Sequence, residues 1–312
     1  MTTMRNGFRI PLALVALFAA AAPLAAQKSR HGGRSSGDDG SRIDTTVAVS
    51  KGVTIDLSIL SGDIKVTTWD KPQVRVTAVS EEGDLRFEAT SQRVSISQEE
   101  ENDDGGDTHY ELVVPRDARV TASGISGDLT IRGVAELEGN SVSGSVTGTD
   151  IAGRTSLQSV SGDVRGSGLG GPVRAQSVSG DVELDAVAGD ITVQTVSGEM
   201  KLRDVKSSYV KTSTVSGDLE FRGALDPKGR YEFNSHSGSF TFAFPRGTGA
   251  LVSFKGFSGE LHSNCQMMLM PGSEGAGHNK GMTFQFGNGG AKVSIETFSG
   301  DVEITGCGTS KD

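Results

Sequence analysis

Glycine recurs at every ninth position through the middle of this 312-residue chain. Alternate glycines end near-identical Val-Ser-Gly turns, so the full repeat is eighteen residues long and has two similar halves. The glycines are Gly144, Gly153, Gly162, Gly171, Gly180, Gly189 and Gly198, and the turns begin at Val142, Val160, Val178 and Val196. A fixed period of this length is typical of repeat proteins, in which each unit buries its apolar face only by stacking on its neighbours.

Apolar residues keep the same period. Within each half repeat they occupy positions x, x+2 and x+5, as in Val173/Ala175/Val178 and Val182/Leu184/Val187. Eleven such triplets can be placed between Leu129 and Ala224, and no charged residue falls on a triplet position. Five triplet positions carry no apolar side chain: three are glycines and two are threonines, namely Gly139, Gly148, Gly166, Thr155 and Thr212. We therefore expect all three triplet positions to face the interior.

Alternation at period two predicts a strand with one buried face. A strand of five residues and a turn of four, twice per eighteen residues, give a coil of two short strands. Each strand then pairs in parallel with its copy in the next coil. The sequence thus predicts an all-β fold, a single-stranded parallel β-solenoid, with right-handed winding as the default for parallel crossovers. A helical interpretation fails because the apolar residues do not recur at i+3 and i+4 and glycine is too frequent.

The same pattern continues toward both ends of the chain. Ile55/Leu57/Leu60 precede a Ser-Gly-Asp turn, and Val252/Phe254/Phe257 and Val293/Ile295/Phe298 precede Ser-Gly-acid turns. The larger residues near the C-terminus predict wider coils. The expected organisation is a signal peptide at 1–26, a flexible linker at 27–42, N-terminal coils at 43–124 with an acidic loop at 97–109, regular repeats at 125–225, and wider C-terminal coils at 226–312 with a loop at 271–281.

The N-terminus has the features of a secretory signal. Arg5 and Arg9 give a positive region, Ile10 to Ala22 an apolar stretch, and Leu24-Ala25-Ala26 a small-residue cleavage site. The apolar stretch is shorter than the ~20 residues that span a bilayer. We expect an extracytoplasmic protein, periplasmic or secreted to the cell surface, with no membrane-spanning segment in the mature chain. In an oxidising compartment Cys265 and Cys307 could form a disulfide, and two buried free thiols are the alternative.

The formal net charge is -9, and the sequence contains no block of lysine and arginine. Nucleic acid and anionic membrane surfaces both require a concentrated basic patch, so neither is an expected partner.

Acidic residues recur after Ser-Gly in the turns. A stacked column of carboxylates could hold Ca²⁺, but each ion needs six or more oxygens. The favoured interpretation is structural: glycine adopts the turn conformation while Ser and Asp hydrogen-bond the turn backbone. The acids are Asp63, Asp128, Asp163, Asp181, Asp218 and Asp301, with Asp190 in a variant Ala-Gly-Asp turn.

Two polar ladders accompany the turns with the eighteen-residue period. They are the amides Asn140, Gln158, Gln176 and Gln194 and the serines Ser143, Ser161, Ser179 and Ser197. Stacked amides can hydrogen-bond along the axis as a structural device. A regular polar face could also bind glycan or another regular surface.

No catalytic, cofactor-binding or metal-binding residue is assigned from the sequence. It lacks the nucleophile, phosphate-loop and HExxH motifs, and its histidines show no metal-ligand spacing. The acidic loop is expected to be a solvated charge run. The alternative of a polysaccharide lyase or hydrolase predicts a cleft lined by Asp181, Glu183, Asp185, Lys201 and Arg203.

Several segments are similar to a bacterial family of adhesin-like β-strand-repeat proteins. Ser61-Gly62-Asp63-Ile64-Lys65-Val66 resembles that family's opening coil, and Val113-Val114-Pro115-Arg116-Asp117-Ala118 resembles its entry into the central coils. Phe257-Ser258-Gly259-Glu260 and Phe298-Ser299-Gly300-Asp301 resemble its closing coils. The resemblance implies a β-helical envelope or surface protein without known catalysis, and it defines no functional residues.

The leading hypothesis is therefore an exported, non-enzymatic scaffold for adhesion or binding, whose partner is an envelope glycan or a surface protein. The second is the lyase or hydrolase named above. The third is a self-assembling structural protein of the envelope, because the open ends of a solenoid favour stacking unless they are capped. The sequence leaves the oligomeric state open.

Overall fold

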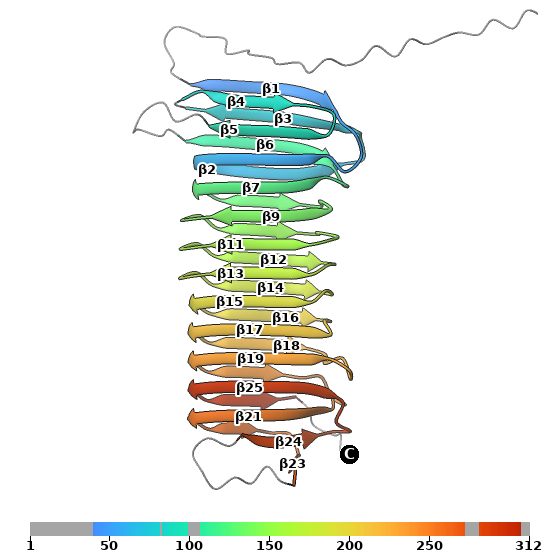
Figure 1. The fold of residues 1–312 in the computed structure, drawn as a ribbon, viewed down its shortest axis with the longest axis vertical. Coiled ribbons are helices and arrows are strands. Elements are labelled where there is room, and N and C mark those ends of the chain that lie inside the picture. The colour runs from blue at the N-terminus through green and yellow to red at the C-terminus, as the bar shows by residue number, and fades with distance from the viewer. Residues whose placement is uncertain (1–39, 82, 99–106, 272–280, 307–312) are drawn as a thin grey trace, which may run out of the picture.

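The computed structural model describes residues 40–81, 83–98, 107–271 and 281–306, and every regular element within these ranges is a β-strand. The strands stack into one elongated column with the N-terminal strands at one end and the C-terminal strands at the other (Figure 1). The predicted all-β solenoid is confirmed. The predicted signal peptide, the linker before Gly40, loop residues 99–106 and 272–280, and Cys307 lie outside the described residues. Cys265 is disulfide-bonded.

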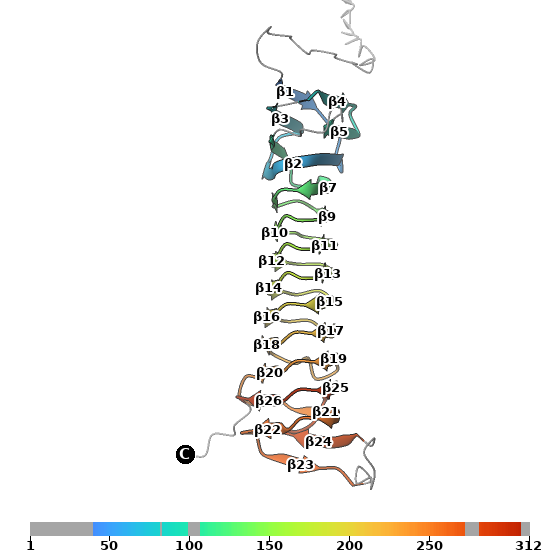
Figure 2. The ribbon, with the colours of Figure 1, turned by 90° about the vertical axis from the view of Figure 1, so that its left-hand side faces the viewer.

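Each central coil contributes two strands, one to each of two opposite faces of the column (Figure 2). Face B consists of β7 (Arg119–Ser126), β9 (Glu136–Ser141), β11 (Thr155–Ser159), β13 (Val173–Ser177), β15 (Ile191–Ser197), β17 (Tyr209–Ser216) and β19 (Arg230–Ser237). Face A consists of β8 (Leu129–Arg132), β10 (Val146–Thr149), β12 (Val164–Leu169), β14 (Val182–Val187), β16 (Met200–Val205), β18 (Leu219–Gly223) and β20 (Phe240–Ala243).

The pairing is parallel and keeps the predicted register. Val146 pairs with Val164, and Val164 with Val182, eighteen positions apart each time. The strands of face B lie in front in Figure 1 and point left, those of face A point right behind them, and the chain descends, so the coil is right-handed. The coils lengthen toward the C-terminus, where Leu219 pairs with Phe240 twenty-one positions on.

The space between the two faces is filled from the x and x+2 positions, which are buried in both halves of the repeat. In the narrow middle coils the interior cannot accommodate a side chain at every x+2 position. A Cβ on Gly166 would come within 2.8 Å of Leu169 and Leu184, which explains the glycines at interior positions. In the wider coils aromatic rings fill the space, with Phe233 and Phe242 meeting edge to face at 4.7 Å between centroids.

Glycines form a continuous column at the turn that leads from face B to face A. A Cβ on Gly180 would lie 2.1 Å from the carbonyl oxygen of Gly162, and a Cβ on Gly162 equally close to that of Gly144. No side chain fits at such a distance, so the coils can stack at strand spacing only if this position is glycine. The column runs through Gly62, Gly127, Gly144, Gly162, Gly180, Gly198, Gly217, Gly238, Gly300 and Gly259 in spatial order.

Both ends of the column carry antiparallel strands. At the N-terminal end β1 pairs with β3, β3 with β6, and β4 with β5; at the C-terminal end β24 pairs with β21 and β23 with β24. The bounds are β1 (Ser41–Ala48), β2 (Thr54–Trp69), β3 (Gln73–Ser80), β4 (Leu85–Ala89), β5 (Arg93–Gln98), β6 (Thr108–Pro115), β21 (Ala250–Ser258), β22 (Leu261–Ser263), β23 (Met267–Leu269), β24 (Met282–Phe286), β25 (Ala291–Ser299) and β26 (Val302–Thr305). Strand β1 begins inside the segment expected to be linker.

The coils do not stack in chain order at the two ends, which corrects the expectation that each strand pairs with its copy in the following coil. Strand β2 lies between β5/β6 and β7/β8, so the first coil is inside the stack. Strand β25 lies between β19 and β21, and β26 between β20 and β22. The last coil is therefore inserted as well (Figure 1). Insertion pairs both edges of these terminal coils and leaves antiparallel strands outermost, except on face A at the C-terminal end, where the short parallel strand β22 is the last.

The glycine column predicts a large cost for a single methyl group. Gly180→Ala should lower the free energy of unfolding by about 1–3 kcal/mol or more, because the new Cβ has backbone rather than a mobile side chain in its way. Chemical denaturation of the purified chain measures this. Ser179→Ala, which changes the exposed neighbour, is the matched control and should be near neutral. Equal stabilities of the two variants would contradict the close approach.

Candidate binding surface

An apolar ladder is exposed along the turn edge of face B. Val178 is 42% exposed, and the residues at the same position in the neighbouring coils are exposed to a similar degree. In spatial order the ladder consists of Ile125, Val142, Val160, Val178, Val196, Val215, His236, Phe298 and Phe257. Parallel pairing of the serines that follow each member keeps the ladder in register. With coils about 4.8 Å apart, its nine side chains extend over about 40 Å.

The ladder ends in a stack of three rings near the C-terminal end of the column. The rings of Phe298 and Phe257 lie 4.7 Å apart at an interplanar angle of 5°, and the imidazole of His236 lies 4.9 Å from Phe298 on the other side. Phe257 is 59% exposed and Phe298 is 49% exposed. Nothing within the described part of the chain covers these rings, so the surface combines aliphatic and aromatic contact area.

The x+5 position of the triplet pattern predicts an interior location for these side chains, and that prediction is wrong for face B. The two halves of the repeat differ at x+4. On face A this residue has a positive φ, as at Gly168 (66°) and Ala186 (52°), which reverses the alternation and turns Val187 at x+5 inward. On face B the strand stays extended, so x+4 points inward and x+5 outward.

A sequence signal for this difference exists at x+4. Face B carries small hydroxyl residues there, and face A carries mainly Gly and Asp, which tolerate positive φ, with Ala186 as the exception. The hydroxyl residues are buried: Ser159 Oγ donates to the carbonyl oxygen of Gly144 at 3.0 Å and accepts from the N–H of Gly162 at 2.9 Å. The face B residues are Ser141, Ser159, Ser177, Thr195 and Thr214, and those of face A are Asp150, Gly168, Ala186 and Asp204.

The predicted amide ladder lies beside the apolar ladder on the same face. Asn140, Gln158, Gln176 and Gln194 are aligned in consecutive coils. Gln176 Nε2 donates to Gln194 Oε1 at 2.5 Å, as expected for stacked amides. This second column has no charged residue from Ser123 to Asn234, so the middle of face B presents an uncharged strip next to an apolar one.

The turn aspartates bond to the backbone of the adjacent coil, which supports their structural interpretation. Asp181 Oδ1 accepts from the N–H of Glu199 at 2.8 Å, and Asp163 Oδ1 from that of Asp181 at 3.0 Å. Asp63, Asp128, Asp218 and Asp301 make the equivalent bond, always toward the coil farther from the N-terminal end. Asp190 lies in a turn at the opposite edge of the column.

The residues expected to line a lyase cleft lie on face A and in the turn before it. Arg203 pairs with Glu183 at 3.0 Å and with Glu220 at 3.3 Å, so one guanidinium bridges two strands. Lys201 Nζ lies 2.5 Å from Glu199, and this hydrogen bond raises the pKa of Lys201. Arg203 is thus neutralised across neighbouring strands and Lys201 within its own turn, so neither cation is free to act on a substrate.

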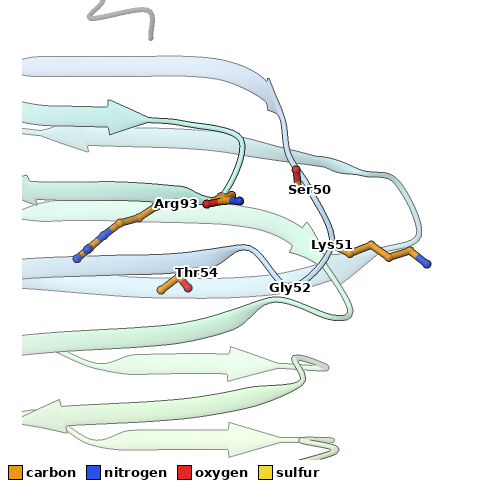
Figure 3. Close-up of a pocket in the computed structure, with 6 residues that line it drawn as sticks. Ser50, Lys51, Gly52, Thr54 and Arg93 are labelled. Atoms are coloured by element: carbon orange, nitrogen blue, oxygen red, sulfur yellow. The ribbon is translucent and has the colours of Figure 1, made fainter. Parts of the chain in front are cut away.

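A hollow of about 400 Å³ near the N-terminal end is lined by Ser50, Lys51, Gly52, Thr54, Gln92 and Arg93. Figure 3 draws these lining residues as sticks. The two cationic side chains of the hollow point away from each other (Figure 3). Arg93 pairs with Asp56 at 2.7 Å, and the N–H of Gly52 donates to Asp117 at 3.0 Å. The hollow therefore offers no converging set of free polar groups.

Among the described residues, no three His, Cys, Asp or Glu side chains gather as metal ligands would. The histidines within the described ranges lie apart from one another: His109 is 3.7 Å from Asp63, His262 is 3.2 Å from Glu260, and His236 belongs to the ring stack. His31 and His278 lie outside those ranges. No helical segment in the described part of the chain has the length and apolar character of a membrane crossing.

The sequence profile of the family described as Toastrack DUF4097 matches residues 106–305, which is more than half of the chain. The chain belongs to this family. The membership confirms the resemblance to adhesin-like repeat proteins noted in the sequence. The matched residues of this Toastrack chain begin after β2, although β2 forms a coil inside its stack. Among curated proteins no sequence matches.

Three solved structures are similar to this Toastrack chain at low identity. A proposed cell-adhesion protein from Clostridium sporogenes is 10% identical, with 85% of this chain and 99% of that chain covered and a TM-score of 0.30. A proposed adhesin from Bacteroides fragilis is 14% identical, with 84% and 96% covered and a TM-score of 0.41. A proposed adhesin from Parabacteroides distasonis is 11% identical, with 85% and 98% covered and a TM-score of 0.34.

The hydrogen bonds that the aspartates accept from the adjacent coil predict that two substitutions of Asp181 differ in their effect on stability. Asp181→Ala should lower the free energy of unfolding by about 0.5–1.5 kcal/mol, because the N–H of Glu199 loses its acceptor. Asp181→Asn keeps a carbonyl oxygen that can accept the same hydrogen bond, so it should lower the free energy of unfolding by less. Thermal melts of both variants, with calcium and with chelator, make the measurement. A wild-type melting temperature that rises with calcium, and a rise lost in both variants, would instead assign these turns to metal binding.

Proposed function

We propose that this protein is an exported, non-enzymatic scaffold that binds another extracytoplasmic molecule through face B. The observation that carries the proposal is the exposed apolar ladder of nine coils with its terminal stack of rings. Soluble monomers rarely expose long contiguous apolar patches, and those that exist mark interaction sites. Isolated exposed apolar residues would need no such explanation, but here they align in register along most of the column.

The polar neighbours of the ladder support a binding role. The amide column supplies hydrogen-bond donors and acceptors, and the serines after each ladder residue are exposed. Apolar contact flanked by uncharged hydrogen-bonding groups is the usual composition of a protein interface. It also suits a glycan, whose C–H faces and hydroxyls need both kinds of contact.

A catalytic role finds less support among the described residues. Catalysis needs groups that converge on a reacting atom. The acids and bases of face A are engaged in cross-strand ion pairs, and the turn aspartates accept backbone hydrogen bonds. We therefore propose a protein that acts by binding and that requires no cofactor.

Export belongs to the proposal because of the N-terminal sequence. The positive region, the apolar stretch and the cleavage site near Ala26 fit a secretory signal. The disulfide at Cys265 fits an oxidising compartment.

The test is binding of the purified chain from Gln27 to cell-envelope fractions. Replacing Val160, Val178 and Val196 by Glu should reduce binding at least tenfold, because three charges would have to be desolvated. Thr147→Glu, Ser167→Glu and Thr241→Glu together add the same charge to face A and should leave binding unchanged. Equal binding by both variants, or none by the wild type, would contradict the role of face B.

A further inference from the structure

We infer that the ladder on face B recognises a second copy of this chain, so that two columns pair side by side along their length. The inference rests on the proposed function and names the partner of the same surface. The surface is an uncovered apolar face, and the question is which molecule has a matching shape. Three features of the described residues answer it: the pitch of the ladder, its area and the distribution of charge beside it.

The pitch favours a second copy. The ladder presents one apolar side chain per coil at about 4.8 Å, a spacing fixed by backbone hydrogen bonds. A second copy necessarily repeats this spacing, so every side chain of one ladder meets a counterpart of the other without cumulative drift. Identical side chains stacked at strand spacing interdigitate well across paired sheets.

The area of the surface approaches that of a standard interface. The apolar column with the amide column on one side and the serine column on the other forms a strip about 40 Å long and roughly 15 Å wide. Its area in projection is about 600 Å², and the accessible area of such a corrugated strip is larger. A standard interface buries roughly 800 Å² per partner. The exposed Phe298 and Phe257 add the large aromatic contacts that dominate binding energy at interfaces.

The charges beside the ladder select the orientation. The turn acids run along one side of the ladder, beyond the serines. The other side carries the uncharged column from Ser123 to Asn234, followed beside Phe298 and Phe257 by Glu296 and Lys255, which pair with each other at 2.8 Å. A two-fold axis perpendicular to the column would set the acids of one copy against the acids of the other. A two-fold axis parallel to the column sets the acids against the amide column instead, which supplies N–H donors. The copies therefore pair in parallel, with each ladder residue opposite its own counterpart.

The ends of the column are consistent with lateral rather than end-to-end association. Antiparallel strands β1, β3 and β4 at one end, and β23 and β24 on face B at the other, replace parallel edges on which another coil would stack; on face A the parallel edge at the C-terminal end is the short strand β22. This self-recognition differs from the end-to-end assembly that open solenoids favour.

The experiment uses a charge swap at one level of the ladder. Sedimentation of the purified chain from Gln27, between about 10 μM and about 1 mM, should show a dimer. Val160→Lys and Val160→Glu should each weaken dimerisation roughly a hundredfold, because like charges then face each other across the two-fold axis. An equimolar mixture should restore the dimer, since Lys meets Glu at the same height. Val160→Thr, an isosteric control, should weaken it far less.

Each other outcome overturns the inference. A wild-type chain that stays monomeric at about 1 mM, or dimers that tolerate both charged variants, removes the ladder as a self-recognition surface. Dimers weakened by each variant but not restored by the mixture exclude the parallel pairing, because Val160 would then face a different level. A monomeric chain that still binds envelope fractions would overturn this inference while leaving the proposed function in place.

Discussion

The structure depends on how closely successive coils approach at one turn. The carbonyl oxygen of each column glycine occupies the space that a Cβ on the next would need, as Gly162 does for Gly180. This contact sets the distance between coils at the edge where the chain leaves face B. Where an aspartate directly precedes a face A strand, it bonds to the backbone of the coil beyond it, as Asp181 does to Glu199. Together these interactions align equivalent residues along the column, and that alignment turns single exposed valines into a ladder.

A stack of this kind is stabilised mainly by contacts between neighbouring coils, so its ends need separate treatment. In this chain the first and last complete coils lie inside the column, so both of their edges are paired. Arg230 of β19 pairs with Lys292 of β25, and the coil of β21 and β22 lies beyond it. Such insertion joins residues far apart in sequence and is expected to slow folding relative to simple coil-by-coil addition. It leaves antiparallel strands outermost at the N-terminal end and on face B at the C-terminal end.

Much of this architecture could be predicted from the repeat. The period determined the coil length and the register, the x and x+2 positions determined the core, and the Ser-Gly-Asp turns were recognised as structural. The exposure of Val178 was missed because valine at x+5 has the same appearance in both halves of the repeat. The conformation of the preceding residue decides its direction, through the positive φ of Ala186 on face A and the extended Ser177 on face B. The inserted coils could not be predicted, because similar coils carry no local signal of which neighbour each will choose.

The most direct test of the account is hydroxyl-radical footprinting, which reports the solvent exposure of individual side chains. In the dilute purified chain, Phe257, Phe298 and His236 should be oxidised readily, while Phe233 and Phe242 should be protected. Adding the binding partner, or raising the concentration until the chain associates, should protect the ladder residues and leave exposed residues of face A such as Thr241 unchanged. Ladder rings that are already protected in the dilute chain, or protection confined to face A, would contradict the claim that the aligned edge of face B is the binding surface.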